Sequence, residues 1–144
     1  MTKIVSVVGK SNQGKTRLIQ QVVPLLKQKG YTVCVVKHST KHLTFKDFDH
    51  PGTDTFTFSQ AGADEVWLTS PDITYHTQNR KTSLNTIIAS SNADFIITEG
   101  FSQEDTKKIV IKSPGDHISV KGEIILTIDK PVSPEEIVDI LIHS

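Results

Sequence analysis

The chain has 144 residues, which suits one domain with a sizeable hydrophobic core. Hydrophobic residues make up 36% and charged residues 22%, which excludes a disordered tail, and no apolar run approaches the ~18 residues of a membrane-spanning helix. Sixteen basic and sixteen acidic residues give a formal charge of zero, which argues against nucleic-acid or membrane binding through bulk charge.

The only cysteine, Cys34, excludes a disulfide framework and a cysteine cluster for zinc. The first residues and the short apolar stretch after them lack the cleavage region of a signal peptide. We therefore expect a cytoplasmic protein with no nucleic-acid or membrane partner, folded as a single domain over residues 1–144.

The beginning of the chain predicts a strand, a helix and a second strand. The β-branched run at 4–8 predicts a buried strand. Apolar residues at helical spacing predict a helix over 15–29, with Gly30 as its C-cap and a kink or break at Pro24. A second apolar run at 31–36 predicts another strand. Together these elements form a parallel crossover unit.

The rest of the chain predicts strands alternating with helices. Further strands are expected at 66–69, 73–77, 95–98, 109–111 and 123–128. The segment 73–77 is either the hairpin partner of 66–69 or an edge strand. Helices are expected after the Pro51-Gly52 break up to 61–63, over 83–91 and over 134–142, the last with Ser133 as its N-cap. This order predicts an α/β fold, a three-layer P-loop NTPase-like domain around a mostly parallel central sheet.

The segment GKSNQGKT at 9–16 fits the phosphate-binding pattern G-x-x-x-x-G-K-[ST] at every fixed position. It follows a predicted strand and opens a predicted helix, so its backbone N–H groups and the positive helix end would converge on one phosphate. Lys15 would contact the β- and γ-phosphates, and the Thr16 hydroxyl would bind Mg²⁺. The alternative is a structural glycine turn that binds nothing. The predicted nucleotide-binding residues here are Gly9, Lys10, Ser11, Asn12, Gln13, Gly14, Lys15, Thr16 and Arg17.

A P-loop enzyme also needs an acidic residue at the end of a neighbouring strand to hold Mg²⁺. Glu99 follows the short apolar run 95–98, at the carboxyl end of a predicted strand, where open α/β sheets bind ligands. The alternative is an ordinary solvated glutamate. We predict Lys15 and Glu99 as catalytic residues, and Thr16, Glu99 and Asp49 as metal ligands.

The polar stretch after the second predicted strand offers contacts for anions or a partner. Lys37 closes that strand and is either a phosphate or partner contact or a solvated flank. His38, His42 and His50 match no zinc spacing, so unpaired loop histidines are the better interpretation. We predict Lys37, His38 and Asp54 as partner or anion contacts.

The sequence gives few indications of which nucleotide base is bound or how fast the nucleotide is hydrolysed. Asp129 either accepts hydrogen bonds from a guanine base, as a nucleotide-binding residue, or caps a turn. Arg17 and Arg80 are the only arginines, and neither is placed as an arginine finger. We therefore expect at most slow hydrolysis.

Taken together, these segments resemble the molybdopterin-guanine dinucleotide biosynthesis adaptor family, MobB. The phosphate loop is common to many NTPases, whereas the Lys-His pair, the P-G-x-D turn, the A-G-A and the E-G-F in this order are more particular. The segments that carry the resemblance are 11–16, 37–38, 49–54, 61–63, 94–101, 108–110 and 126–131.

The resemblance implies a GTP-binding accessory protein that assists a guanylyltransferase in attaching a guanosine nucleotide to molybdopterin. It further implies a homodimer, Mg²⁺ as cofactor, weak Mg²⁺-dependent GTP hydrolysis at most, and molybdopterin or its carrier proteins as further partners. The alternative is a P-loop small-molecule kinase or an ATP-dependent NTPase of another pathway. Thr53 and Ser102 stand where the family usually has lysine, which removes two positive charges from the expected phosphate edge.

Overall fold

The computed structural model describes residues 1–10 and 14–144. These residues form two compact units, one of Met1–His38 with Ser90–Ser144 and the other of Ser39–Ala89. Among the described residues, no helix has the length and apolar character that a bilayer crossing requires. The single nucleotide-binding domain over residues 1–144 stays a prediction.

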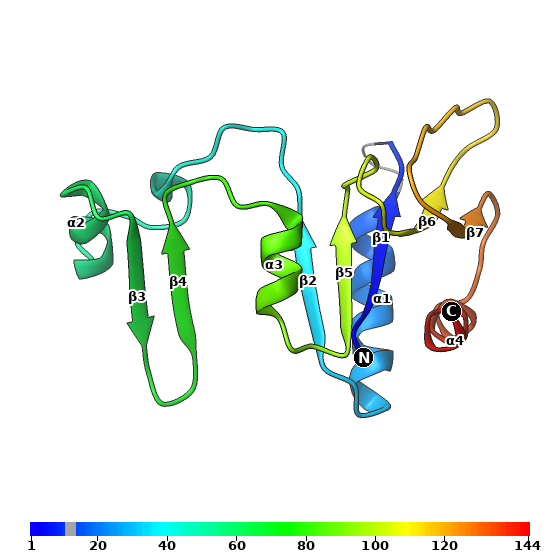
Figure 1. Ribbon diagram of the computed structural model, residues 1–144, viewed down its shortest axis with the longest axis horizontal. Coiled ribbons are helices and arrows are strands. Elements are labelled where there is room, and N and C mark those ends of the chain that lie inside the picture. Colours follow the sequence, from blue (N-terminus) through cyan, green and yellow to red (C-terminus); the bar gives the residue numbers. More distant parts are fainter. Residues whose placement is uncertain (11–13) are drawn as a thin grey trace. The chain divides into compact units, whose positions relative to one another are not determined.

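The first unit is built on a five-stranded sheet in the order β2-β5-β1-β6-β7 (Figure 1). All pairings between these strands are parallel, with a register shift at Lys108 and Ile109 in the pairing of β6 with β7. This confirms the predicted α/β class with a mostly parallel central sheet. The strands are β1 (Lys3–Val8), β2 (Val33–Lys37), β5 (Phe95–Glu99), β6 (Lys107–Ile111) and β7 (Ile124–Ile128).

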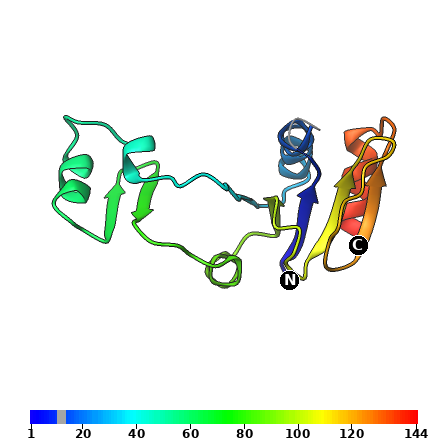
Figure 2. The ribbon, with the colours of Figure 1, turned by 90° about the horizontal axis from the view of Figure 1, so that it is seen from above.

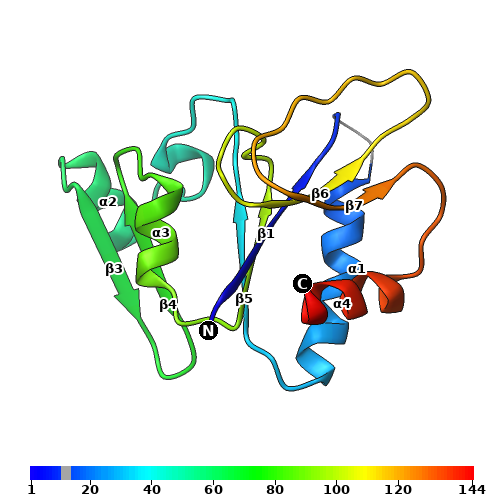
Figure 3. The same cartoon turned by 45° about the vertical axis from the view of Figure 1, so that its right-hand side comes forward.

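Two helices, α1 (Lys15–Gln28) and α4 (Pro134–His143), cover one face of this sheet (Figure 2). They lie side by side, as Figure 3 shows. Burying one valine, leucine, isoleucine or phenylalanine side chain stabilises a folded chain by about 1.5–3 kcal/mol. The packing on this face is therefore the main source of hydrophobic stabilisation. The buried core residues are Val5, Val7, Leu18, Ile19, Val22, Leu26, Phe95, Ile97, Ile109, Ile111, Ile137, Val138 and Leu141.

The carboxyl end of α1 is closed by a Schellman motif, as the predicted C-terminal glycine implies. Gly30 has a φ of 90° and donates its N–H to the carbonyl oxygen of Lys27 at 3.0 Å. The N–H of Tyr31 donates to the carbonyl oxygen of Leu26 at 3.1 Å. The Tyr31 ring then packs edge-on against Phe95, which anchors the turn from α1 into β2.

Of the kink or break predicted at Pro24, the break is wrong, because α1 continues through this residue as one helix, and the kink stays a prediction. A proline inside a helix removes one backbone donor and crowds the preceding turn. Pro24 lies on the exposed side of α1, where the carbonyl left without a partner can bond to water. The buried stripe on the other side, which includes Val22 and Leu26, holds the helix together.

The opposite face of the sheet carries a buried polar row. Thr98 of β5 and Ser6 of β1 are partners in register, and the Thr98 hydroxyl donates to Ser6 Oγ at 2.8 Å. Lys108 of β6 is fully buried, and its ammonium donates to the carbonyl oxygens of Glu104 and Thr106 and to the Thr106 hydroxyl, at 2.6 to 2.8 Å. Burial lowers the pKa of Lys108. These bonds fix the turn that follows β5 to the sheet.

The second unit contains an antiparallel hairpin and short helices. Its strands β3 (Glu65–Thr69) and β4 (Thr74–Gln78) pair antiparallel, which confirms the hairpin alternative for the second of them. The indole of Trp67 stacks on the His76 ring of the other strand, with ring centroids 3.5 Å apart. The helices are η1 (Phe45–Asp47), α2 (Asp54–Gln60) and α3 (Leu84–Ser90), and α3 ends at the first residue after this unit.

Two glycines with similar backbone angles provide a matched test of the packing around the turn after β5. Gly122 (φ +90°) and Gly115 (φ +84°) are both left-handed, but a Cβ on Gly122 would overlap the carbonyl oxygen of Thr106, whereas one on Gly115 meets nothing within 4 Å. Alanine at either position lowers the free energy of unfolding by about 1–3 kcal/mol, because it must adopt a left-handed backbone conformation. We expect Gly122→Ala to lower the free energy of unfolding by about 1–3 kcal/mol more than Gly115→Ala does.

Urea denaturation of the two variants beside the wild type measures this difference. Equal losses of stability in Gly122→Ala and Gly115→Ala would contradict the close approach of residue 122 to Thr106.

Candidate functional site

The candidate site lies where parallel, neighbouring strands end at one edge of the sheet. Glu99 at the end of β5 is the register partner of Val7 on one side and of Lys37 on the other. Register partners project to the same face of a sheet, and Val7 belongs to the core that α1 covers. The side chains of Glu99 and Lys37 therefore project from the sheet face that α1 covers.

Glu99 is held by a hydroxyl and an ammonium group. Its Oε1 accepts a hydrogen bond of 2.7 Å from the Thr16 hydroxyl, in the first turn of α1. Its Oε2 pairs with the Lys37 ammonium at 2.8 Å. Glu99 as a whole is only 9% exposed. The hydrogen bond from Lys37, and then that from Thr16, hold the pKa of Glu99 below its usual range although burial opposes this.

The described part of the phosphate loop lies against β6 and leads into α1. A Cβ on Gly9 would lie 2.8 Å from the carbonyl oxygen of Ile111, so only glycine fits there without a shift. The Lys15 ammonium donates to the carbonyl oxygen of Gly9 at 2.9 Å. Gly14, with a φ of 89°, precedes α1 and gives it no side-chain cap. Ser11, Asn12 and Gln13, also predicted to bind nucleotide, lie outside the described residues.

The amino end of α1 has the electrostatic character of an anion site. Its first turn contains no acidic residue, and Gly14 at the N-cap position has no side chain that could cap it. The first N–H groups of a helix have no partner within the helix, and the helix dipole adds partial positive charge there. Lys15 and the exposed Arg17 increase this positive charge.

An ion pair that sequence analysis missed joins the loop to the segment after β6. Lys10 pairs with Asp116 at 3.0 Å, and the N–H of Ser113 donates to the same carboxylate at 2.9 Å. The hydrogen bond from Ser113, and then that from Lys10, lower the pKa of Asp116. The Pro114-Gly115 turn before Asp116 marks a loop in the sequence, but nothing there indicates which lysine this carboxylate meets.

The turn after β5 accounts for the Glu-Gly-Phe segment. Gly100 has a φ of +98°, and a Cβ on it would lie 3.3 Å from that of His38. Phe101 is a non-glycine residue with a positive φ, 63°, and its ring lies 5.0 Å from the His38 ring. The backbone N–H of His38 donates to the carbonyl oxygen of Glu99 at 3.0 Å. His38 thus supports the turn beside Glu99.

Asp129, the remaining predicted nucleotide-binding residue of the first unit, is exposed just after β7. Because β7 is parallel to β1, Asp129 follows its strand at the same edge of the sheet as Gly9. Its two interpretations, base contact and turn residue, stay predictions.

Asp49 and Asp54 belong to the second unit. The Asp49 carboxylate accepts hydrogen bonds from the hydroxyls of Thr53, at 2.7 Å, and Thr55, at 2.6 Å. These two hydrogen bonds lower the pKa of Asp49, and the bond from Thr55 contributes most. Thr53 in turn caps α2 by accepting from the N–H of Phe56, and Asp54 is exposed in the first turn of that helix. Asp49 therefore organises the start of α2 within its own unit.

The other two histidines of the polar stretch, His42 and His50, are exposed in the second unit. The His50 ring lies 3.2 Å from the carbonyl oxygen of Pro51. Among the described residues, no three His, Cys, Asp or Glu side chains gather as a metal-binding group.

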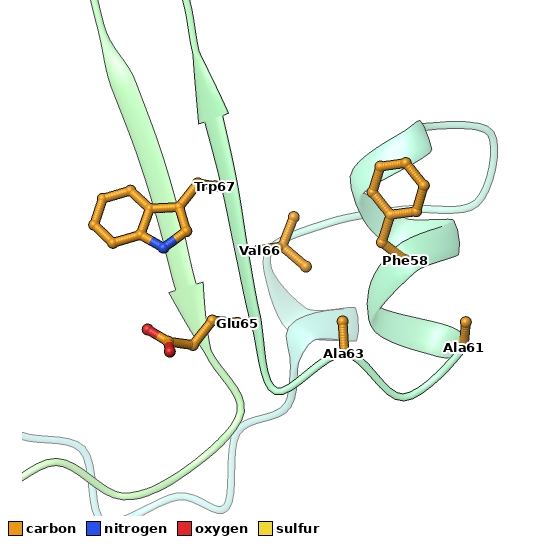
Figure 4. Close-up of a pocket in the computed structure, with 6 residues that line it drawn as sticks. All are labelled: Phe58, Ala61, Ala63, Glu65, Val66 and Trp67. Atoms are coloured by element: carbon orange, nitrogen blue, oxygen red, sulfur yellow. The ribbon is translucent and has the colours of Figure 1, made fainter.

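The second unit also has a hollow of about 430 Å³ along β3. Figure 4 shows Val66 pointing toward α2, while Trp67 and Glu65 project from the other side of the strand. Of the predicted site residues that the structure describes, none lines this hollow. The lining residues are Phe58, Ala61, Ala63, Glu65, Val66 and Trp67.

Comparison with known proteins points to one family. Residues 4–128 match the model of the family described as molybdopterin guanine dinucleotide synthesis protein B, MobB. The chain belongs to this family.

Individual MobB relatives agree with this assignment. The chain is 27% identical over 122 residues to the molybdopterin-guanine dinucleotide biosynthesis adapter protein of Escherichia coli, covering 80% of this chain and 68% of that one. A relative of similar name from Methanocaldococcus jannaschii is 31% identical over 103 residues, 70% of this chain, and the chain spans only 42% of its length.

Among solved structures, that of molybdopterin-guanine biosynthesis protein B is similar over 97% of both chains, with a TM-score of 0.74 and 29% identity. These matches confirm the resemblance to MobB and the fold, and they do not favour the kinase alternative.

The paired Glu99 predicts a pH dependence of stability. Its pKa in the folded chain lies below the value of about 4.3 for an unpaired glutamate, so the unfolded state binds the additional proton first as the pH falls. The contribution of Glu99 is therefore complete above about pH 4.3 and is lost as the pH falls through the lower, folded-state pKa. We expect Glu99→Gln to weaken the acid dependence of the free energy of unfolding.

Urea denaturation between about pH 6 and about pH 3 measures this slope. Glu123→Gln, which changes an exposed carboxylate, is the matched control. If Glu99→Gln keeps the acid dependence of the wild type, the pairing of Glu99 is contradicted.

Proposed function

We propose that this chain is an adapter in the biosynthesis of molybdopterin guanine dinucleotide and that it binds GTP together with Mg²⁺. The observation that carries the proposal is the 2.7 Å hydrogen bond between Thr16 and Glu99. It joins the first turn of α1, a helix end without acidic residues, to the carboxyl end of a buried parallel strand. The names of the MobB relatives supply the pathway.

The side chains at this edge fit a magnesium ion. Mg²⁺ prefers oxygen ligands and is commonly held by one or two protein oxygens together with phosphates. The Thr16 hydroxyl and the Glu99 carboxylate offer such oxygens next to the expected phosphate position. When bound there, the ion would neutralise charge on the β- and γ-phosphates.

Lys15 supplies the positive charge of the loop itself. Its ammonium is bonded to a backbone carbonyl, that of Gly9, rather than to a carboxylate. A phosphate oxygen is a stronger acceptor than a carbonyl, because a hydrogen bond between charged partners is shorter and stronger than one to a neutral group. Lys15 can therefore exchange Gly9 for a phosphate without breaking an ion pair.

Hydrolysis by this site is proposed to be slow. Rapid phosphoryl transfer needs a residue that orients water and an arginine over the phosphates. Arg80 lies in the second unit and is 3.8 Å from Glu65, and Arg17 is exposed on α1. The nucleotide would serve to prepare the adapter for its partner rather than to drive rapid turnover.

The proposed partner is the guanylyltransferase that attaches the nucleotide to molybdopterin, with molybdopterin or its carrier proteins as further partners. The word adapter in the names of the relatives supports such a role. A cytoplasmic location and a homodimer, formed by one domain of 144 residues per subunit, belong to the same proposal.

Lys15→Ala tests the loop directly. A hydrogen bond to a charged group is worth about 1.5–3 kcal/mol, so we expect affinity for GTP to fall at least about tenfold while the fold is kept. Isothermal titration calorimetry with GTP, with and without Mg²⁺, measures the loss, and circular dichroism checks the fold. Lys27→Ala, at the other end of α1, is the control and should bind like the wild type.

Unchanged affinity in Lys15→Ala would show that the nucleotide, if bound, is held elsewhere. Equal losses in Lys15→Ala and Lys27→Ala would point to a general charge effect instead of the loop.

The choice of base is tested at Asp129. We expect GTP to bind more tightly than ATP, and Asp129→Ala to reduce this preference by about tenfold, because a carboxylate can accept two hydrogen bonds from guanine but not from adenine. Calorimetry with both nucleotides measures the ratio, and Asp139→Ala, exposed on α4, is the control. An unchanged ratio in Asp129→Ala assigns this residue to the turn.

A further inference from the structure

Both oxygens of the Glu99 carboxylate are already engaged within the chain. Thr16 donates to one of them and Lys37 to the other, at 2.7 and 2.8 Å. The carboxylate that is proposed to help hold Mg²⁺ thus carries its own positive partner. This matters because a lysine ammonium and a divalent ion are both attracted to the same carboxylate and repel each other.

The two partners of Glu99 differ in how easily they can leave it. Thr16 is part of α1, so its position is fixed by the helix and the core beneath it. Lys37 is the last residue of β2, and its side chain is 65% exposed although its ammonium reaches the nearly buried carboxylate. A lysine has a flexible four-carbon stem and a strongly hydrated head, so its ammonium can turn into water while the backbone of β2 stays in place.

The two lysines of the described part of the phosphate loop have other partners. Lys15 is bonded to Gly9 and Lys10 to Asp116. Among the residues that the structure describes, Lys37 is the one whose ammonium forms an ion pair with Glu99. Register explains this specificity, because Lys37 and Glu99 are direct partners on adjacent strands.

We propose that Lys37 is an internal counter-ion of Glu99 that must leave the carboxylate before a magnesium–nucleotide complex is held there. In the metal-free chain, Lys37 keeps the Glu99 carboxylate neutralised and in place beside Thr16. Lys37 is thereby a positioning residue that sets how much Mg²⁺ the site requires. This inference rests on the proposed nucleotide site.

The test is the Mg²⁺ dependence of nucleotide binding in Lys37→Gln. Glutamine can still donate a hydrogen bond to Glu99 but carries no charge, so it removes the competition while keeping a partner for the carboxylate. We expect the Mg²⁺ concentration at which the affinity for a non-hydrolysable GTP analogue is half-maximally enhanced to fall about tenfold, as removing one positive charge beside a divalent ion implies. The binding of Mn²⁺, followed by electron paramagnetic resonance, gives a second readout that does not depend on turnover.

Two control variants separate charge from structure. Lys37→Arg keeps the positive charge and should keep the wild-type metal dependence within about twofold. Lys29→Gln removes a charge from an exposed position at the far end of α1 and should also leave it unchanged. Because Lys37 is exposed, its variants are expected to fold, and circular dichroism verifies this.

A Mg²⁺ midpoint in Lys37→Gln equal to or higher than that of the wild type, with the analogue still bound, would overturn the counter-ion role alone. If the wild type binds no GTP analogue at any Mg²⁺ concentration, the proposed function fails and the inference fails with it. A lower midpoint in Lys37→Gln but not in Lys37→Arg or Lys29→Gln supports the inference.

Discussion

The pairing of β5 between β1 and β2 is the constraint on which the candidate site depends. Its register aligns Val7, Glu99 and Lys37 in one row across three strands. Side chains alternate between the faces of a sheet, so a shift of one residue would turn Glu99 away from α1 and away from Thr16. The buried run that precedes Glu99 opposes such a shift, because it would move Phe95 and Ile97 from the apolar core to the face with the buried polar row.

The same strands carry two different kinds of chemistry on their two faces. The sheet face that packs against α1 is apolar as far as the carboxyl ends of its strands. There Glu99 contacts both Lys37 and Thr16. The opposite face holds a hydrogen-bonded row through Thr98, Ser6 and Lys108, which fixes the turn after Glu99. A buried lysine is costly unless all its donors are satisfied, as those of Lys108 are. Both faces therefore restrain the end of β5.

Much of this arrangement could be predicted from the sequence because it depends on local patterns. The glycine-rich loop, the apolar strand before Glu99 and the cap at Ser133 each follow from a few neighbouring residues, and the cap is confirmed. The continuity of α1 through Pro24 depends on tertiary packing, which cannot be predicted from the helix propensities of the neighbouring residues. The pairing of Lys37 with Glu99 and of Lys10 with Asp116 depends on strand order and loop path, which only the folded chain shows.

Hydrogen–deuterium exchange of the wild-type chain tests most directly whether nucleotide binds between the first turn of α1 and the end of β5. With GTP and Mg²⁺ added, we expect slower exchange in peptides that contain Thr16 and in those that contain Glu99. Slower exchange confined to the α2–β3 hollow around Trp67, with the first turn of α1 unchanged, would contradict it.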